Sequence, residues 1–251
     1  MGKISVVALI FLLALPGKTF AESELRKKIL HADFEINSPE LEQQKIALDK
    51  TTSDSITIDC TIARQGNCSL KSIIKNSERY IAYGALRSES NASKVPGVMY
   101  KNGDHFVYFF SLFMDDFWNQ PDQNTLDIIW QFKRFGSGPD MFIGIKNNSL
   151  VWRITEHEQI TLLKPLVTGK WIDVYFDIKW SEYDDGHANT RIEVEGQYPK
   201  DFNFIGRNMR FADSKYGTVQ WGLYKPGNLE DFHFDTHFIN HDEIYIYKIE
   251  K

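Results

Sequence analysis

Apolar and polar residues alternate along most of this chain, in short runs separated by clusters of Gly, Pro, Asn and Asp. A period of two places the apolar side chains on one side of an extended backbone, so each run predicts a half-buried β-strand. We expect strands at residues 31–36, 55–62, 79–87, 105–113, 126–135, 141–146, 149–154, 171–180, 190–196, 218–225 and 243–250. A short helix is expected only at residues 22–29, so no helical crossovers are available to connect parallel strands. The pattern predicts an all-β fold, an antiparallel β-sandwich of jelly-roll type.

The first residues have the pattern of a secretory signal peptide. Lys3 precedes an apolar run from Ile4 to Leu15, and Ala21 closes a short segment suited to cleavage. This run is shorter than the roughly 20 residues that span a bilayer. We therefore expect residues 1–21 to be a signal peptide and residues 22–251 to form a single domain. The mature protein is expected to be secreted or periplasmic, outside the membrane, and a monomer.

The charge balance narrows the choice of partner. The formal net charge is −5, and removing Lys3 and Lys18 with the signal peptide gives −5 − 2 = −7. An acidic chain disfavours a nucleic-acid partner. An anionic polysaccharide remains compatible if basic residues gather at one site. The candidates are five basic residues in one late segment, Lys200, Arg207, Arg210, Lys215 and Lys225, together with Arg87, Lys133 and Arg134.

The chain has two cysteines, Cys60 and Cys68. Export would place them in an oxidising compartment, where a pair at this spacing favours a structural disulfide. A redox pair is usually spaced C-x-x-C, and a zinc site would need further ligands nearby. We expect a disulfide with no chemical role.

Alternation also predicts which polar side chains share a face. In the strand at 126–135, Trp130 and Phe132 point to one side while Gln131 and Lys133 point to the other. By the same rule Arg87 and Glu89 share one face of their strand, and Tyr224 lies opposite the apolar face of the strand at 218–225. If these three strands are neighbours, Arg87, Gln131, Lys133 and Tyr224 converge.

Several short motifs, in this order, resemble the heparin-lyase-I-like and glucuronan-lyase-like polysaccharide lyases, whose jelly roll some alginate lyases share. Arg87-Ser88-Glu89 resembles the family's R-x-E strand, Gln131-Phe132-Lys133 its Q-x-H strand, and Gly222-Leu223-Tyr224 its G-x-Y strand. Three further segments are similar to this family: Gly169–Val174, Lys179-Trp180-Ser181 with Asp185-Gly186, and His241–Ile244. The resemblance covers most of residues 80–250.

The resemblance implies β-elimination in a polymer that contains uronic acid. Such a site must neutralise the substrate carboxylate, remove the weakly acidic C5 proton and protonate the leaving oxygen. Arg87 and Gln131 are suited to neutralisation and Tyr224 to proton transfer, assisted by positive charge from Lys133 or Lys225. Glu89, Arg134, Lys225 and Arg210 are the expected substrate-binding residues. The resemblance implies no cofactor and no metal in the reaction, and it leaves room for a structural calcium ion.

Alternatives remain open. Lys133 stands where the family has a histidine, so a glycan-binding protein that has lost its chemistry is the second candidate. A glycoside hydrolase would need two flanking carboxylates, and no strand has the expected acidic pattern. Without the resemblance, these polar residues would be read as the solvated face of a sheet. A spacing of four would bring three histidines to one face of a helix as metal ligands, and His233, His237 and His241 have this spacing, but the pattern of their segment is not helical. The positions of three other histidines cannot be predicted from the sequence: His105, His157 and His187.

Overall fold

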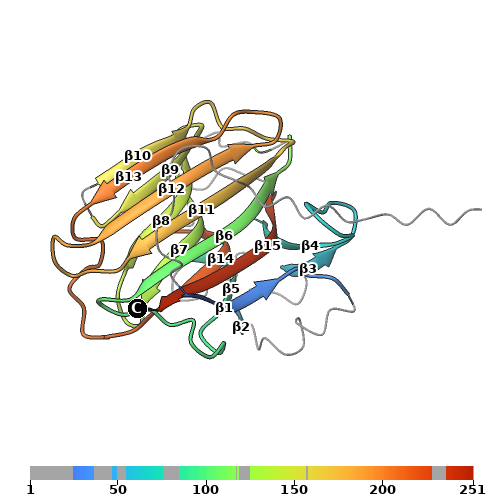
Figure 1. Cartoon of the computed structure of the whole chain (residues 1–251). Helices are drawn as coiled ribbons and strands as arrows, with labels where there is room; N and C mark the ends of the chain where they lie inside the picture. The colour runs from blue at the N-terminus through green and yellow to red at the C-terminus, as the bar shows by residue number, and fades with distance from the viewer. Residues whose placement is uncertain are drawn as a thin grey trace, which may run out of the picture.

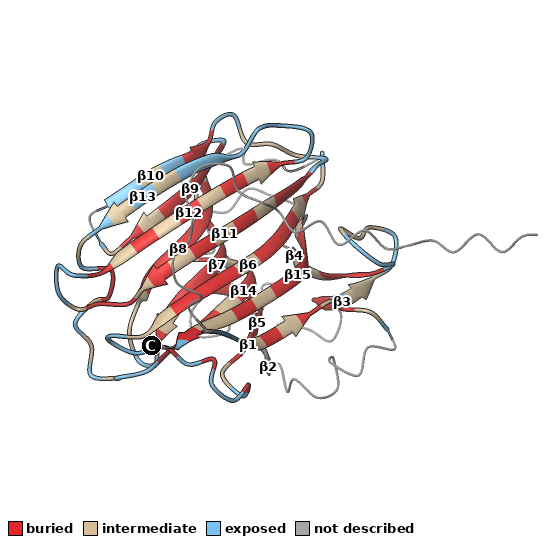
Figure 2. Ribbon diagram, viewed as in Figure 1, coloured by how far each residue is buried: buried red, intermediate tan, exposed pale blue. Residues whose placement is uncertain are grey.

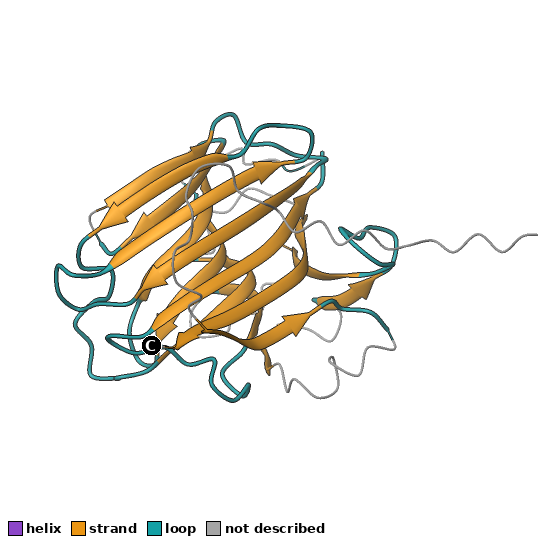
Figure 3. Cartoon of the chain, in the orientation of Figure 1, coloured by secondary structure: helices purple, strands orange, loops and turns teal. Residues whose placement is uncertain are grey.

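The computed structural model describes residues 25–36, 47–49, 55–75, 85–116, 118, 125–156, 158–227 and 236–250. Within these ranges the chain forms strands joined by loops and turns, with no helix (Figure 3). The strands are β1 (Leu25–Ala32), β2 (Ala47–Asp49), β3 (Ile56–Asp59), β4 (Ser69–Lys75), β5 (Leu86–Asn91), β6 (His105–Met114), β7 (Asp127–Arg134), β8 (Pro139–Lys146), β9 (Ser149–Ile154), β10 (Glu158–Leu163), β11 (Trp171–Lys179), β12 (His187–Val194), β13 (Lys200–Ile205), β14 (Gly217–Lys225) and β15 (Thr236–Glu250). The predicted signal peptide lies outside the described residues.

Two antiparallel sheets form the molecule (Figure 1). One has the strand order β13-β12-β11-β6-β15-β4-β3, and β1 also pairs with β15. The other has the order β10-β9-β8-β7-β14-β5-β2. Neighbours that are distant in sequence, such as β6 with β15 and β7 with β14, give the crossed connections of a jelly roll. The predicted all-β sandwich is confirmed.

Buried residues recur along the strands of both sheets (Figure 2), and the core between the sheets is rich in aromatic side chains. Phe110 of β6 stacks on Trp130 of β7 with ring centroids 3.8 Å apart, and Trp152 of β9 meets Phe176 of β11 at 5.6 Å. These contacts join opposite sheets, so they fix which face of each strand points inward. Because side chains alternate, Gln131 must point away from the core that Trp130 and Phe132 fill.

The helix expected at residues 22–29 is wrong for the part that the structure describes. Residues from Leu25 onward form β1, which pairs with the second half of β15. A register shift between Lys28 and Leu30 turns Leu30 and Ala32 into the core, where each is about 1% exposed. Pairing with a distant strand and burial of these two side chains outweigh the local helix propensity of the charged residues.

Most other strand predictions are confirmed, with shifted bounds. Residues 31–36 form a strand only as far as Ala32. Of the strand predicted at 79–87, residues 79–84 lie outside the described residues, and the last two belong to β5, which continues to Asn91. The strand predicted at 243–250 is the second half of the longer β15. Strands β2, β4, β10 and β13 and the first half of β15 were not predicted; β10 and β13 are the outer strands of their sheets and are largely exposed.

Cys60 and Cys68 form the predicted disulfide, with an S–S length of 2.00 Å. The loop that it closes is held by acidic side chains from elsewhere in the chain. Asp242 Oδ2 accepts hydrogen bonds from the backbone N–H groups of Arg64 and Gln65, and Glu35 Oε1 accepts from those of Asn67 and Cys68. Among the described residues, no helix is long and apolar enough to cross a membrane.

Candidate active site

The three strands with the lyase-like motifs are neighbours in the seven-stranded sheet, in the order β7-β14-β5. Tyr224 of β14 is directly opposite Arg87 of β5, and Gln220 of β14 is directly opposite Gln131 of β7. These side chains, with Glu89, lie on the sheet face that points away from the core. We call Arg87, Glu89, Gln131, Gln220 and Tyr224 the polar cluster.

Direct contacts connect the members of the polar cluster. The guanidinium carbon of Arg87 lies 4.1 Å from the ring centroid of Tyr224, and its Nη1 lies 3.3 Å from Glu89 Oε2. The Gln131 amide nitrogen donates to Glu89 Oε1 at 2.6 Å and to Gln220 Oε1 at 3.0 Å. A cation over the face of an aromatic ring is attracted by the quadrupole of the ring. This contact therefore holds the Arg87 guanidinium beside the phenol of Tyr224.

Two buried atoms of the polar cluster, Arg87 Nε and Gln131 Oε1, have no hydrogen-bond partner among the residues that the structure describes. Buried polar atoms are rarely left without a partner. An Arg Nε–H donor beside a partly exposed tyrosine suits a carboxylate of an incoming sugar.

Gln220 was missed in the sequence analysis, although its signal was present. It lies four residues before Tyr224 in the same strand, and its side chain is on the same face as Gln131. Register pairs extend this line of side chains across the sheet, through Phe142 of β8 to Arg153 of β9. The Arg153 guanidinium lies 5.6 Å from the ring of Phe142. From β14 across the sheet to β9, this line presents the amides of Gln220 and Gln131, then the ring of Phe142, then the guanidinium of Arg153.

Lys133 is on the same side of the sheet but toward its far end. It pairs with Thr218, whereas Tyr224 pairs with Ile128, five residues away along β7. At about 3.3 Å per residue, the Cα atoms of Lys133 and Tyr224 are about 17 Å apart. Lys133 therefore does not contact Tyr224, and the cation beside the Tyr224 ring is Arg87.

Arg134 lies elsewhere, fully buried on the opposite side of β7. Its Nε and Nη2 donate to the two carboxylate oxygens of Asp140 at 3.1 and 2.9 Å, and its Nη1 donates to Glu182 at 2.7 Å. Tyr100 also donates to Asp140, at 2.8 Å. Burial raises the pKa of Asp140 despite these contacts. The predicted substrate-binding Arg134 is instead the centre of an internal ion-pair network.

Lys225 and Arg210 are also outside the polar cluster. Lys225 points into the sandwich, where its Nζ lies 2.5 Å from Asp127 of β7, and His237 of β15 lies 3.3 Å from the same carboxylate. Burial opposes ionisation of Asp127, but its contacts with His237 and Lys225 outweigh that effect and lower its pKa. Arg210 is in the loop before β14, where its Nη2 lies 2.5 Å from Glu156. Neither side chain is directed at Tyr224.

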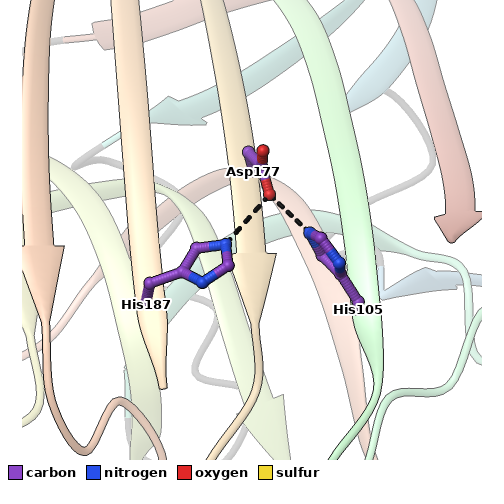
Figure 4. A group of neighbouring side chains, drawn as sticks. All are labelled: His105, Asp177 and His187. Atoms are coloured by element: carbon purple, nitrogen blue, oxygen red, sulfur yellow. Dashed lines mark hydrogen bonds and ion pairs between the residues drawn. The ribbon is translucent and has the colours of Figure 1, made fainter. Parts of the chain in front are cut away.

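Of the histidines at spacing four, His237 and His241 belong to the strand β15 and not to a helix, and His233 lies outside the described residues. Burial lowers the pKa of His241 to about 3, so its imidazole is neutral between the sheets. His105 and His187, which could not be placed from sequence, meet on the outer face of the other sheet (Figure 4).

Comparison with known proteins supports a lyase. Solved structures similar to this chain include an endo-β-1,4-glucuronan lyase from Trichoderma reesei, with a TM-score of 0.68 and 19% identity over 88% of this chain and 95% of that one. An alginate lyase from Aplysia kurodai aligns with a TM-score of 0.56 and 13% identity over 90% and 99% of the two chains. An alginate lyase from Klebsiella pneumoniae aligns with a TM-score of 0.51 and 10% identity over 78% and 84%. At these identities the structures show a shared fold, and no curated protein matches the sequence.

The family assignment rests on the sequence itself. The polysaccharide lyase family model matches residues 34–246, a segment that includes every member of the polar cluster. This match favours the lyase over the glycan-binding alternative. The chain belongs to the polysaccharide lyase family.

Proposed function

We propose that the protein cleaves a uronate-containing anionic polysaccharide by β-elimination at the polar cluster. The observation that carries the proposal is the contact of Arg87 with Tyr224 at 4.1 Å, beside the amide of Gln131. In the reaction, the C5 proton is removed, its electron pair forms the C4–C5 double bond, and the C4–O bond breaks. The leaving oxygen takes up a proton. The site must make the C5 proton acidic and supply the base.

Arg87 and Gln131 are the groups that neutralise the uronate carboxylate. Arg87 Nε–H has no partner in the described part of the chain, whereas the two N–H groups of the Gln131 amide donate to Glu89 and Gln220, so Gln131 donates to a carboxylate only by exchanging one of these acceptors for it. Neutralisation lowers the cost of placing negative charge next to the carboxylate in the transition state. Glu89 holds both donors, through Arg87 Nη1 and Gln131 Nε2, and therefore acts as a positioning residue.

Tyr224 transfers the proton. Its phenol is partly exposed on the strand β14, and the guanidinium of Arg87 lies over its ring. Lys133 and Arg153, on the same face of the sheet, bind carboxylates of sugars farther along the polymer. The chemistry calls for no cofactor. We infer that the protein works outside the cytoplasm as a monomer, in keeping with the signal-like first 21 residues and the disulfide.

The test is the ultraviolet absorbance of the unsaturated uronate while the purified protein is incubated separately with glucuronan, alginate, heparin and heparan sulfate. We expect the absorbance to rise with at least one polymer. Tyr224→Phe should lower the initial rate about 10²- to 10⁴-fold. Tyr183→Phe, an exposed tyrosine in the loop between β11 and β12, is the matched control and should retain full activity.

Arg87→Lys tests whether Arg87 contributes only its positive charge or also the planar geometry of its guanidinium. Lysine retains the positive charge but has no planar fork of donors, so we expect a loss of activity that added salt does not restore. Absence of an unsaturated product with all four polymers, from protein with an unchanged circular dichroism spectrum, would refute β-elimination on uronates. Equal rates for Tyr224→Phe and the unmodified protein would refute the assignment of Tyr224.

A further inference from the structure

Three side chains that the lyase proposal does not use meet on the outer face of the eight-stranded sheet. They are His105 of β6, Asp177 of β11 and His187 of β12, from three adjacent strands (Figure 4). The His105 Nε2 atom lies 2.6 Å from Asp177 Oδ1, and the His187 Nε2 atom lies 3.2 Å from the same oxygen. The polar cluster is on the other sheet, so this group is independent of the proposed lyase function.

Strand register explains why the three side chains converge. His105 and His187 are both directly opposite Lys179 of β11, one from each side. Asp177 lies two residues before Lys179 and so projects from the same face. The intervening Phe176 and Ile178 point into the core. The group is thus built on three rigid, hydrogen-bonded strands rather than on loops.

The group is open to solvent. The exposed fractions of the side chains are 21% for His105, 24% for Asp177 and 30% for His187. The neighbouring cation, Lys179, is directed to Asp185, with Nζ 2.8 Å from its carboxylate and 3.0 Å from its carbonyl oxygen. The ammonium group is therefore paired with Asp185, away from the two imidazoles. An ion can reach the three donor atoms from outside.

The donor atoms have the chemistry of metal ligands. Both imidazole Nε2 atoms point at one carboxylate oxygen, and the ligand atoms all lie within 4.8 Å of one another. Around a tetrahedral zinc ion at about 2.0–2.2 Å, ligand atoms are about 3.4 Å apart, so modest side-chain rotation is sufficient.

We propose that His105, Asp177 and His187 form a binding site for one divalent transition-metal ion, with zinc as the expected occupant. Two imidazoles and one carboxylate favour zinc, nickel or copper over calcium and magnesium, which prefer a full shell of oxygen ligands. Three protein ligands leave a coordination position for water or an external donor. The bound ion connects β6, β11 and β12 on the face opposite the polar cluster.

The test is isothermal titration of the purified protein, free of any polyhistidine tag and treated with a chelator, with Zn²⁺, Ca²⁺ and Mg²⁺ separately. We expect one Zn²⁺ per chain and no saturable heat from Ca²⁺ or Mg²⁺ at this site. Asp177→Asn and His187→Gln should each weaken Zn²⁺ binding about tenfold or more. His31→Gln, a partly exposed histidine on β1, is the matched control and should bind like the unmodified protein.

Cobalt gives a second measurement. Co²⁺ in the same site should produce the visible absorption of a low-coordinate ion with nitrogen and oxygen ligands, and this absorption should disappear in Asp177→Asn. Circular dichroism confirms that each variant is folded. Absence of Zn²⁺ binding by the folded protein, or binding that both variants retain in full, would overturn the site.

Discussion

Lys133 and Arg134 are adjacent in sequence, and the structure gives them opposite roles that one pair of variants can separate. Lys133 is partly exposed on the face of the polar cluster, whereas the Arg134 side chain is 0% exposed among Asp140, Glu182 and Tyr100. Replacing each with methionine removes the charge and keeps much of the side-chain volume. We expect Arg134→Met to lower stability and Lys133→Met to weaken substrate binding.

The size of the Arg134 effect follows from its contacts. Its guanidinium makes three hydrogen bonds to two carboxylates, and Asp140 is itself 0% exposed. Removing one partner of a buried ion pair costs about 3–5 kcal/mol because the other charge stays buried. For a domain of this size, each kcal/mol shifts the melting temperature by about 2–4 °C, so the expected decrease is about 6–20 °C. Arg134→Met should leave KM unchanged at temperatures where it is folded.

The effect of Lys133 should appear in kinetics. A hydrogen bond to a charged group contributes about 1.5–3 kcal/mol, so Lys133→Met should raise KM at least about tenfold. Its free energy of unfolding should change by less than about 0.5 kcal/mol, as for other surface substitutions. Thermal melting and initial rates of unsaturated product formation measure both quantities. A wild-type melting temperature together with a raised KM in Arg134→Met would refute the placement of Arg134 inside the protein.

Three further predictions concern the core, the disulfide and the missed glutamine. Because burial lowers the pKa of His241 to about 3, the unfolded chain takes up a proton that the native state does not as pH falls below about 6.5. Between pH 7.5 and 4.5, urea denaturation should therefore show the unmodified protein losing about 2.5 kcal/mol relative to His241→Gln, and parallel pH dependence would contradict this. Replacing Cys60 and Cys68 together with serine should lower the free energy of unfolding by about 2–3 kcal/mol, as expected for opening a short loop; an unchanged urea midpoint would contradict it. Gln220→Leu removes the acceptor of the Gln131 amide and should reduce kcat more than stability; unchanged kcat would show that Gln220 does not position Gln131.

The fold class followed from sequence because strand alternation is a local property. Trp130 and Gln131 point to opposite faces in any antiparallel sheet, and the structure places them so. The adjacency of β5, β14 and β7 in one sheet is not a local property, because strand order depends on connections between segments far apart in the chain. The sequence could state only the condition under which Arg87, Gln131 and Tyr224 meet, and the topology fulfils it. The outer strand β13 did carry a local signal, because Phe202 and Phe204 alternate with polar residues and pack against the core, but it was not predicted.

Strand alternation also predicts that Arg134 and Lys225 point into the core, although both were expected to bind substrate. Arg134 follows Lys133, and Lys225 follows Tyr224, so if the first of each pair faces outward the second must face the core. A charge on the core side needs a buried partner, and the partners are Asp140 and Asp127. Their identity depends on tertiary contacts, but the need for them follows from alternation alone. A basic residue next to a predicted site residue in a strand is thus evidence for an internal ion pair, and only the cations with the same parity as Tyr224 remain candidates for binding substrate.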